Sequence, residues 1–399
     1  MFEKIVLRRS EKGPALSAGE LAEALLFYQN VNLILDYPSL NGLISQVGMP
    51  KLLALLARPN VSAVYCEESL GTTTNRIGAM EYHSFVAFTF SGSQEVGQLS
   101  RKKRLEYILT KKGYDKHVAK KLTERFRELV PIRKLSDDYF LPGGVVNAAA
   151  DDILDTKFVN EAVRRVLSHT VCVPQLMGDY RFEILHTPTG FQIVTDVDFN
   201  AINEARKSRD LRLGDINPAH IVNEILMARA DTALAAHYGG EFYTSDVTSQ
   251  IIRLRYSELL KRAGIEAEEL RQLKEVVVAD SPSIREVIDS GERTFDEFLI
   301  LLEKSERFRA WIKSIHPDEK LVRAYLKDVT AEGWISKLPS KCIRYIFGAL
   351  VGLAQPAAGL ILSAGDALLL EKIMGGWRPT HFVEGKLKPF LGTDDNEDR

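Results

Sequence analysis

The sequence predicts a mixed α/β fold, in which an N-terminal α/β sheet with a β-hairpin precedes a largely helical middle and C-terminal half. Three observations predict it. Short apolar runs alternate with helical patterns over residues 1–100, residues 181–199 have a hairpin pattern, and helical spacing dominates from residue 217 onward. The 399 residues, with 45% hydrophobic and 27% charged side chains, have a globular composition and suffice for two or three domains.

The first hundred residues alternate between helix and strand patterns. Ser17 is a suitable N-cap for a helix over 18–27, whose apolar residues recur at helical spacing. We expect strands at 31–35, 61–66 and 83–90, a helix over 40–56 with a break near Gly48, and a polar loop over 71–79. Strands separated by helices indicate an α/β sheet with parallel connections.

The rest of the chain is predicted to be mainly helical after one hairpin. The apolar runs 181–185 and 191–199 flank HTPTG, a connection with proline and glycine. Helices are expected over 218–238, 245–263, 283–290 and 294–311, with Asn217 and Thr294 as N-caps. The expected domains are an α/β domain over 1–205, a helical domain over 206–330, an apolar C-terminal region over 331–392 and an acidic tail over 393–399.

An apolar stretch over 343–374 separates the candidate functions. Residues 345–365 contain no charge, but Gln355–Pro356 interrupts them near the middle. Because proline breaks or kinks a helix, two short arms are expected and a stable single transmembrane span is not. We expect a helical hairpin that docks into a partner, a second subunit or a membrane through its small residues, which are Gly348, Gly352, Pro356 and Gly359.

A basic segment over 101–134 gives the strongest surface signal. It contains 13 Lys and Arg against 4 Asp and Glu, in a chain whose net charge is −2. Val118, Leu122 and Phe126 share one helical face, with the cations opposite. The segment predicts contact with nucleic acid or anionic lipid, although following aspartates could balance its charge. Its candidate binding residues are Arg101, Lys102, Lys103, Arg104, Lys111, Lys112, Lys120 and Lys121.

Two acidic clusters suggest an enzyme as the alternative. Asp36 and Glu67 follow predicted strands, and Asp196 and Asp198 are expected to share one face of a strand. Carboxylates gathered in this way could hold Mg²⁺ for phosphodiester chemistry. Acidic residues also end strands and cover solvent-facing surfaces routinely, and the spacing matches no nuclease motif. The helix predicted over 218–238 carries His220, Glu224 and Asp231 on one polar face, with His237 on the same helix. We interpret this face as solvated, and not as a metal site.

Several functional classes lack their signatures. The three cysteines form no CxxC pair, and phosphate-loop, GxSxG and zinc-type Cys/His spacings are absent. The cysteine usage and the N-terminus predict a cytoplasmic protein, with contact at the inner face of a membrane left open. The sequence favours a non-catalytic effector or binding protein, by analogy with toxin-like and bacterial defence effectors. A metal-dependent nuclease or phosphohydrolase is the alternative, and the sequence does not decide between them.

Overall fold

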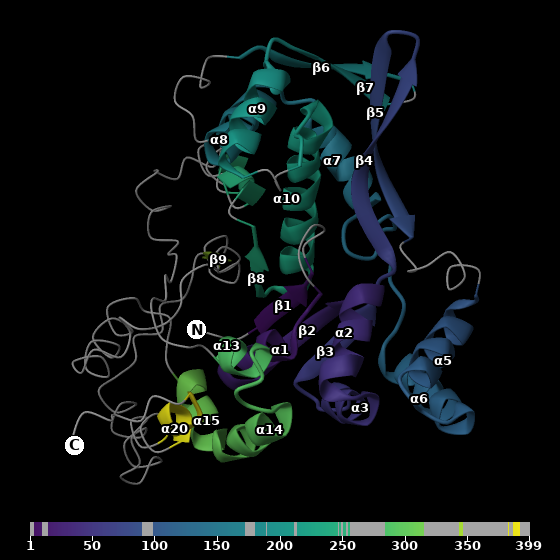
Figure 1. Ribbon diagram of the computed structural model, residues 1–399, viewed down its shortest axis with the longest axis vertical. Coiled ribbons are helices and arrows are strands. Elements are labelled where there is room, and N and C mark those ends of the chain that lie inside the picture. Colours follow the sequence, from purple (N-terminus) through teal and green to yellow (C-terminus); the bar gives the residue numbers. More distant parts are fainter. Residues whose placement is uncertain are drawn as a thin grey trace, which may run out of the picture.

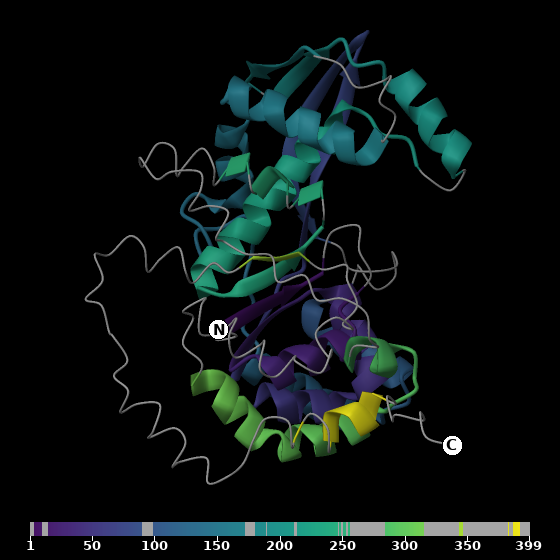
Figure 2. The same ribbon diagram turned by 90° about the vertical axis from the view of Figure 1, so that its left-hand side faces the viewer.

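The computed structural model confirms the mixed α/β class. It describes residues 4–9, 15–89, 99–171, 180–188, 190–210, 214–245, 247–248, 250–252, 254–255, 284–314, 343–345, 382 and 386–391. Two sheets follow one another along the long axis of the molecule, and a long helix, α10 (Pro218–Tyr238), runs between them (Figure 1, Figure 2).

The first sheet is mainly parallel and has the strand order β3-β2-β1-β8-β9. Its strands are β1 (Lys4–Arg8), β2 (Asn30–Leu35), β3 (Val61–Tyr65), β8 (Glu241–Thr244) and β9 (Ile343–Tyr345). The first four are parallel, and β9 pairs antiparallel with β8. The predictions of strands at 31–35 and 61–66 are confirmed. Ile343–Tyr345 were expected to be helical, and that prediction is wrong because these residues complete the sheet edge.

Alternation along the parallel strands sends side chains into two separate cores. Ile5 and Leu7 of β1 face one core, and Val6 faces the other. The first core contains α1 (Ala18–Phe27), α2 (Tyr37–Val47), α3 (Met49–Leu56), α13 (Ile284–Asp289), α14 (Phe295–Lys304) and α15 (Glu306–Ser314). The second contains α10, which returns the chain to β8. The helix predicted over 40–56 consists of α2 and α3, with the expected break at Gly48. The φ of Gly48 is 85°, which is not helical, so α2 ends there.

The second sheet is antiparallel, with the order β4-β5-β7-β6. It comprises β4 (Glu68–Ile77), β5 (Met80–Thr89), β6 (Phe182–Thr187) and β7 (Gly190–Thr195), so the predicted hairpin is confirmed. The predicted loop over 71–79 is wrong, since most of it belongs to β4. The threonines at 72–74 are polar, which favours a loop, but they are also β-branched, and β-branched residues suit a half-exposed strand.

Helix α10 joins the two halves of the molecule. It packs against β1 and β8 of the parallel sheet, β4 and β5 of the antiparallel sheet, and α7 (Gly144–Asp152) and α8 (Thr156–Val171). Twelve of its residues are buried, on faces all around the helix. Helix α13 similarly packs on α1 at Gly19, where a Cβ atom would lie 2.4 Å from the carbonyl oxygen of Arg285. Elements from the ranges 1–205 and 206–330 therefore share sheets and cores.

A buried histidine makes the antiparallel sheet sensitive to acid. His83 is 3% exposed, its ring lies 5.8 Å from that of Phe191, and its Nδ1 lies 2.9 Å from Thr74 Oγ1. Burial lowers the pKa of His83 below its ordinary value of 6.5, against a smaller opposite effect of Glu81. The neutral ring therefore stabilises the fold fully above about pH 6.5. This contribution is lost as the pH falls through the lower pKa of the folded state.

We expect urea titrations to show a lower free energy of unfolding at pH 5 than at pH 7.5. His83→Asn should reduce this difference, because asparagine does not titrate. A difference that is the same in wild type and variant would contradict the role assigned to His83.

Candidate functional site

The carboxyl ends of the parallel strands carry paired charges. Arg9 Nε donates a hydrogen bond to Asp36 Oδ2 at 2.6 Å, and Arg8 Nη1 donates to Asp231 Oδ1 on α10 at 3.0 Å. Asp36 also accepts a hydrogen bond from Ser39 N at 2.8 Å and caps α2. Open α/β sheets bind ligands at this edge. Here the predicted site residue Asp36 has both oxygens engaged within the chain.

Glu67, the second predicted carboxylate of this edge, is buried in an ion pair. Both of its oxygens accept hydrogen bonds from Arg104 Nη2, at 2.7 and 2.8 Å. The side chains are only 4% and 11% exposed, respectively. The neighbouring Glu68 accepts bonds from the backbone N–H groups of Leu135 and Ser136 at 2.7 and 2.9 Å. The contacts of Glu68 attach the segment after the basic helices to the start of β4.

A polar cavity at this edge has room for about one water molecule. Burial raises the pKa of the Cys66 thiol in its wall to about 11. At neutral pH this thiol is protonated, and a protonated thiol is a poor nucleophile. The lining residues are Arg8, Arg9, Ile34, Asp36, Cys66, Glu68 and Leu135.

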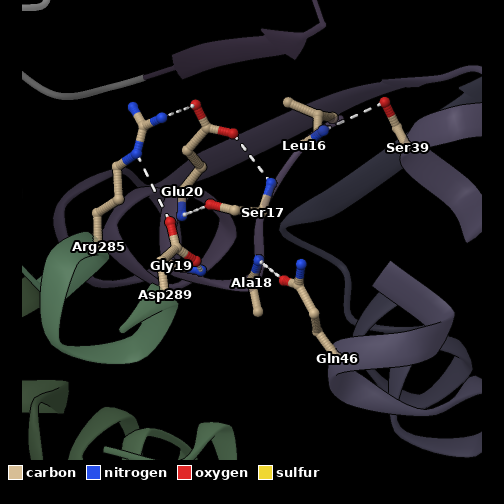
Figure 3. A network of polar contacts seen from close by, with 9 residues as sticks. All are labelled: Leu16, Ser17, Ala18, Gly19, Glu20, Ser39, Gln46, Arg285 and Asp289. Atoms are coloured by element: carbon tan, nitrogen blue, oxygen red, sulfur yellow. Dashed lines mark hydrogen bonds and ion pairs between the residues drawn. The ribbon is translucent and has the colours of Figure 1, made fainter. Parts of the chain in front are cut away.

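The N-terminus of α1 is closed by the chain's own side chains (Figure 3). In dinucleotide-binding folds the helix after the first strand receives a phosphate at this point. In this chain Gly19 N donates to Asp289 Oδ1 at 3.0 Å, and Ala18 N donates to Gln46 Oε1 at 2.6 Å. Ser17 and Glu20 form a reciprocal capping box. An aspartate from α13 thus lies where an anion would otherwise bind.

Asp196 and Asp198 lie beside the other sheet, after its strand β7. Both follow the end of β7 and are not in the strand, so the prediction that they share one strand face is wrong. Asp196 Oδ1 accepts a hydrogen bond from Arg181 N at 2.7 Å, which closes the hairpin base. Asp198 caps α9 (Phe199–Arg209), which lies at the far end of the molecule from β2 and β3 (Figure 1). The structure therefore brings Asp36 and Glu67 together at one sheet edge. It does not bring Asp196 and Asp198 to the same place.

The polar residues of α10 also have structural partners. Asp231 accepts hydrogen bonds from Arg8 and from Thr244 Oγ1, and Glu224 accepts one from Thr248 Oγ1. His220 forms a capping box with Asn217, and the ring of His237 packs among Tyr139, Phe140 and Tyr238. Within the described part of the chain, no group of three His, Cys, Asp or Glu side chains could hold a metal ion.

The basic segment forms an antiparallel helix pair, α5 (Arg101–Lys111) and α6 (Lys116–Leu129). The face of α6 that is buried against the first core carries Ala119, Thr123 and Phe126, with Leu122 partly buried. Val118, which was predicted to share the apolar face, is 43% exposed, so that part of the prediction is wrong. Ala119 and Phe126 are 1% and 3% exposed, and the Phe126 ring meets Tyr65 of β3 edge-on at 6.0 Å. Figure 1 shows the pair at the periphery, beside α2 and α3. The packing therefore directs the other face of α6, which carries most of its charge, to solvent.

The predicted basic residues divide into an inward-facing or paired group and an exposed group, except Arg101, whose side chain lies outside the described part of the structure. Arg104 points inward to Glu67, and Lys102 pairs with Glu124 at 3.1 Å. Lys111 lies 5.5 Å from the Tyr107 ring, and Lys112 donates to Ser45. The exposed cations of the helix pair and its connection, defined here as the basic surface, are Lys103, Lys111, Lys112, Lys116, Lys120, Lys121, Arg125 and Arg127.

The cations of this surface lower the pKa of a carboxylate that lies among them. The pKa of Glu124 is lowered, first by the hydrogen bond and charge of Lys102 and then by the charges of Lys120 and Arg127. Lys116, Lys120, Glu124 and Arg127 lie on one stripe of α6, since offsets of 4, 8 and 11 return to the same side. One carboxylate is thus surrounded by cations that stabilise negative charge.

The predicted docking residues Gly348, Gly352, Pro356 and Gly359 lie outside the described residues. No described helix is long and apolar enough to cross a membrane. The sequence did not indicate Arg8, Arg9 or Asp231 as partners at the sheet edge. Their pairing joins residues 27 and 223 positions apart, and no local pattern reports such contacts.

Comparison with known proteins adds no relative. The chain matches no protein-family model, and neither curated proteins nor solved structures give a significant match.

Proposed function

We propose that this protein is a non-catalytic binding protein whose basic surface holds an anionic polymer, with nucleic acid as the partner. The observation that carries the proposal is the geometry of α5 and α6. Most of their apolar residues pack in the first core, although Tyr107 and Val118 are 37% and 43% exposed, while eight cations of the pair and its connection stay exposed. Cations that neutralise phosphates release bound counterions, which drives association without a shaped pocket.

The buried apolar face favours nucleic acid over a membrane. A helix that lies in a membrane interface inserts its apolar face among the lipid chains. Phe126 and Ala119 cannot do so, because they pack in the core of the protein. The exposed cations are then the main feature left for binding, and charge alone suffices to bind a phosphate backbone. Tyr107, which is 37% exposed beside Lys111, adds a surface on which a base could stack.

The engagement of the candidate carboxylates supports a non-catalytic role. Asp36 and Glu67 accept hydrogen bonds from arginines, and Asp198 caps a helix. Magnesium would have to compete with these partners, and it needs near-ideal octahedral geometry with several oxygens. The apolar stretch over 343–374 lies almost wholly outside the described residues. Its docking into a partner, a second subunit or a membrane therefore stays a prediction, as does any defence role.

Fluorescence anisotropy tests this function. We expect the full chain to bind labelled duplex DNA, single-stranded DNA or RNA with a dissociation constant of about 10⁻⁴–10⁻⁶ M at physiological salt, and more tightly at low salt. Mg²⁺ in the buffer should leave the nucleic acid intact. Absence of binding at low salt would contradict the proposal. Binding to phosphatidylserine vesicles alone would replace nucleic acid with lipid, and cleavage abolished by Asp36→Asn would favour the nuclease alternative.

A further inference from the structure

The antiparallel sheet has one face covered by helices and one with exposed apolar residues. Phe85 and Phe191 are buried on the inward face, where α7, α8 and α10 pack. The outward residues alternate with these along each strand. β4 and β5 extend along one side of the molecule in Figure 1. In the described part of the chain the helices that pack on β4 and β5 are α7 and α10, and both belong to the core that holds Phe85 and Phe191.

Four outward residues form one apolar patch across all four strands. Ile77, Met80, Leu185 and Val194 are 68%, 59%, 47% and 43% exposed. Ile77 pairs directly with Met80 in the β4–β5 hairpin. His83 pairs with Phe191, and continuing this register places Val194 opposite Met80.

Two observed contacts support this register. Gln192 Nε2 lies 3.5 Å from Met80 Sδ, and Leu185 pairs with Gln192. Thus β5, β7 and β6 present these side chains next to one another. We define Ile77, Met80, Leu185 and Val194 as the sheet patch.

The sheet patch has the size and charge of an interface core. Its four adjacent side chains are 43–68% exposed, which makes an apolar patch of a few hundred Å². Contiguous apolar patches of this size on a monomer are often functional. On the outward face Arg181 pairs with Glu183, which lies opposite Val194, whereas Arg76 and Glu81 pair with each other on the opposite face of the β4–β5 hairpin. The patch thus has a neutral rim and offers no charge to attract a charged partner.

We propose that the sheet patch is covered by the same patch of a second copy of this chain. A two-fold contact brings identical surfaces together, which is favourable for an apolar patch with internally paired charges. Two sheets pack face to face at about 10 Å, with their facing side chains interdigitated. The patch would supply the apolar centre of an interface of about 800 Å² per partner. This proposal does not depend on the nucleic-acid function, because the basic surface is on a different element.

Analytical ultracentrifugation of the full chain over a wide concentration range tests the proposal. We expect a reversible dimer of the 44.7 kDa chain. Met80→Arg should raise its dissociation constant at least about 100-fold, because like charges brought together at an interface cost several kcal/mol. Leu154→Arg is the matched control, since Leu154 is also 59% exposed but lies after α7. It should dimerise like the wild type.

Charge complementation identifies the surface that makes the contact. Met80→Arg and Met80→Glu should each be monomeric alone and form a heterodimer when mixed. A wild type that is monomeric at every concentration would overturn the proposal, as expected if another segment of the chain covers the patch. A dimer unaffected by Met80→Arg, equal loss in Leu154→Arg, or a mixture that stays monomeric would also overturn it.

Discussion

Removing three cations from α6 is expected to weaken nucleic-acid binding about 100-fold. Lys116, Lys120 and Lys121 are exposed, and Lys120 is one of the charges that lower the pKa of Glu124. A lysine near an anionic surface contributes about 1 kcal/mol. Replacing all three with alanine should therefore raise the dissociation constant by about two orders of magnitude. Alanine retains the helix, so the fold should be unchanged.

A matched variant separates this local effect from the loss of net charge. Replacing Lys157, Lys304 and Arg307 with alanine also removes three exposed cations, but from α8, α14 and α15. Its affinity for nucleic acid should stay within a few-fold of the wild type. Equal weakening in both variants would contradict a defined basic surface.

Replacing Arg104 with alanine is expected to destabilise the protein by about 3–5 kcal/mol, because it removes the guanidinium that pairs with a buried carboxylate. Glu67 is 4% exposed and accepts both hydrogen bonds from this one guanidinium. Urea titration would measure the loss. Lys103→Ala, next in sequence but exposed, should change the free energy of unfolding by less than about 0.5 kcal/mol.

An apolar replacement of both partners tests the cause. Glu67→Leu combined with Arg104→Met removes the buried charge together with its partner, so it should recover most of the lost stability. A stable Arg104→Ala variant would contradict a buried ion pair. In that case the Arg104 side chain of the wild type would be available to bind nucleic acid, as the sequence predicts.

The sequence predicted those elements whose signal is local. The apolar pattern is clear in β2, β3 and α10. The β6–β7 hairpin has turn residues between its two apolar runs. β1, β8 and β9 are three to five residues long, and their strand character comes from pairing across the sheet. The threonine run of β4 is polar in composition and acquires its structure from a ten-residue pairing with β5.

The candidate site was harder to predict because a side chain's role depends on its partner. The sequence placed Asp36 and Glu67 at neighbouring strand ends, as observed. It did not show that Arg9 and Arg104 meet them, since those contacts depend on how the chain returns to the sheet edge. The basic segment was recognisable from composition. Which cations face solvent depended on Phe126 and Ala119 packing inward.

The salt dependence of binding tests the central claim most directly. The logarithm of the binding constant should fall linearly with the logarithm of the NaCl concentration, with a slope of about −0.9 per phosphate contacted on duplex DNA. Removing Lys116, Lys120 and Lys121 should make the slope less steep by about 2–3, and the matched control should keep the wild-type slope. A wild-type slope near zero, or one unchanged in the three-lysine variant, would contradict a basic surface that binds phosphates.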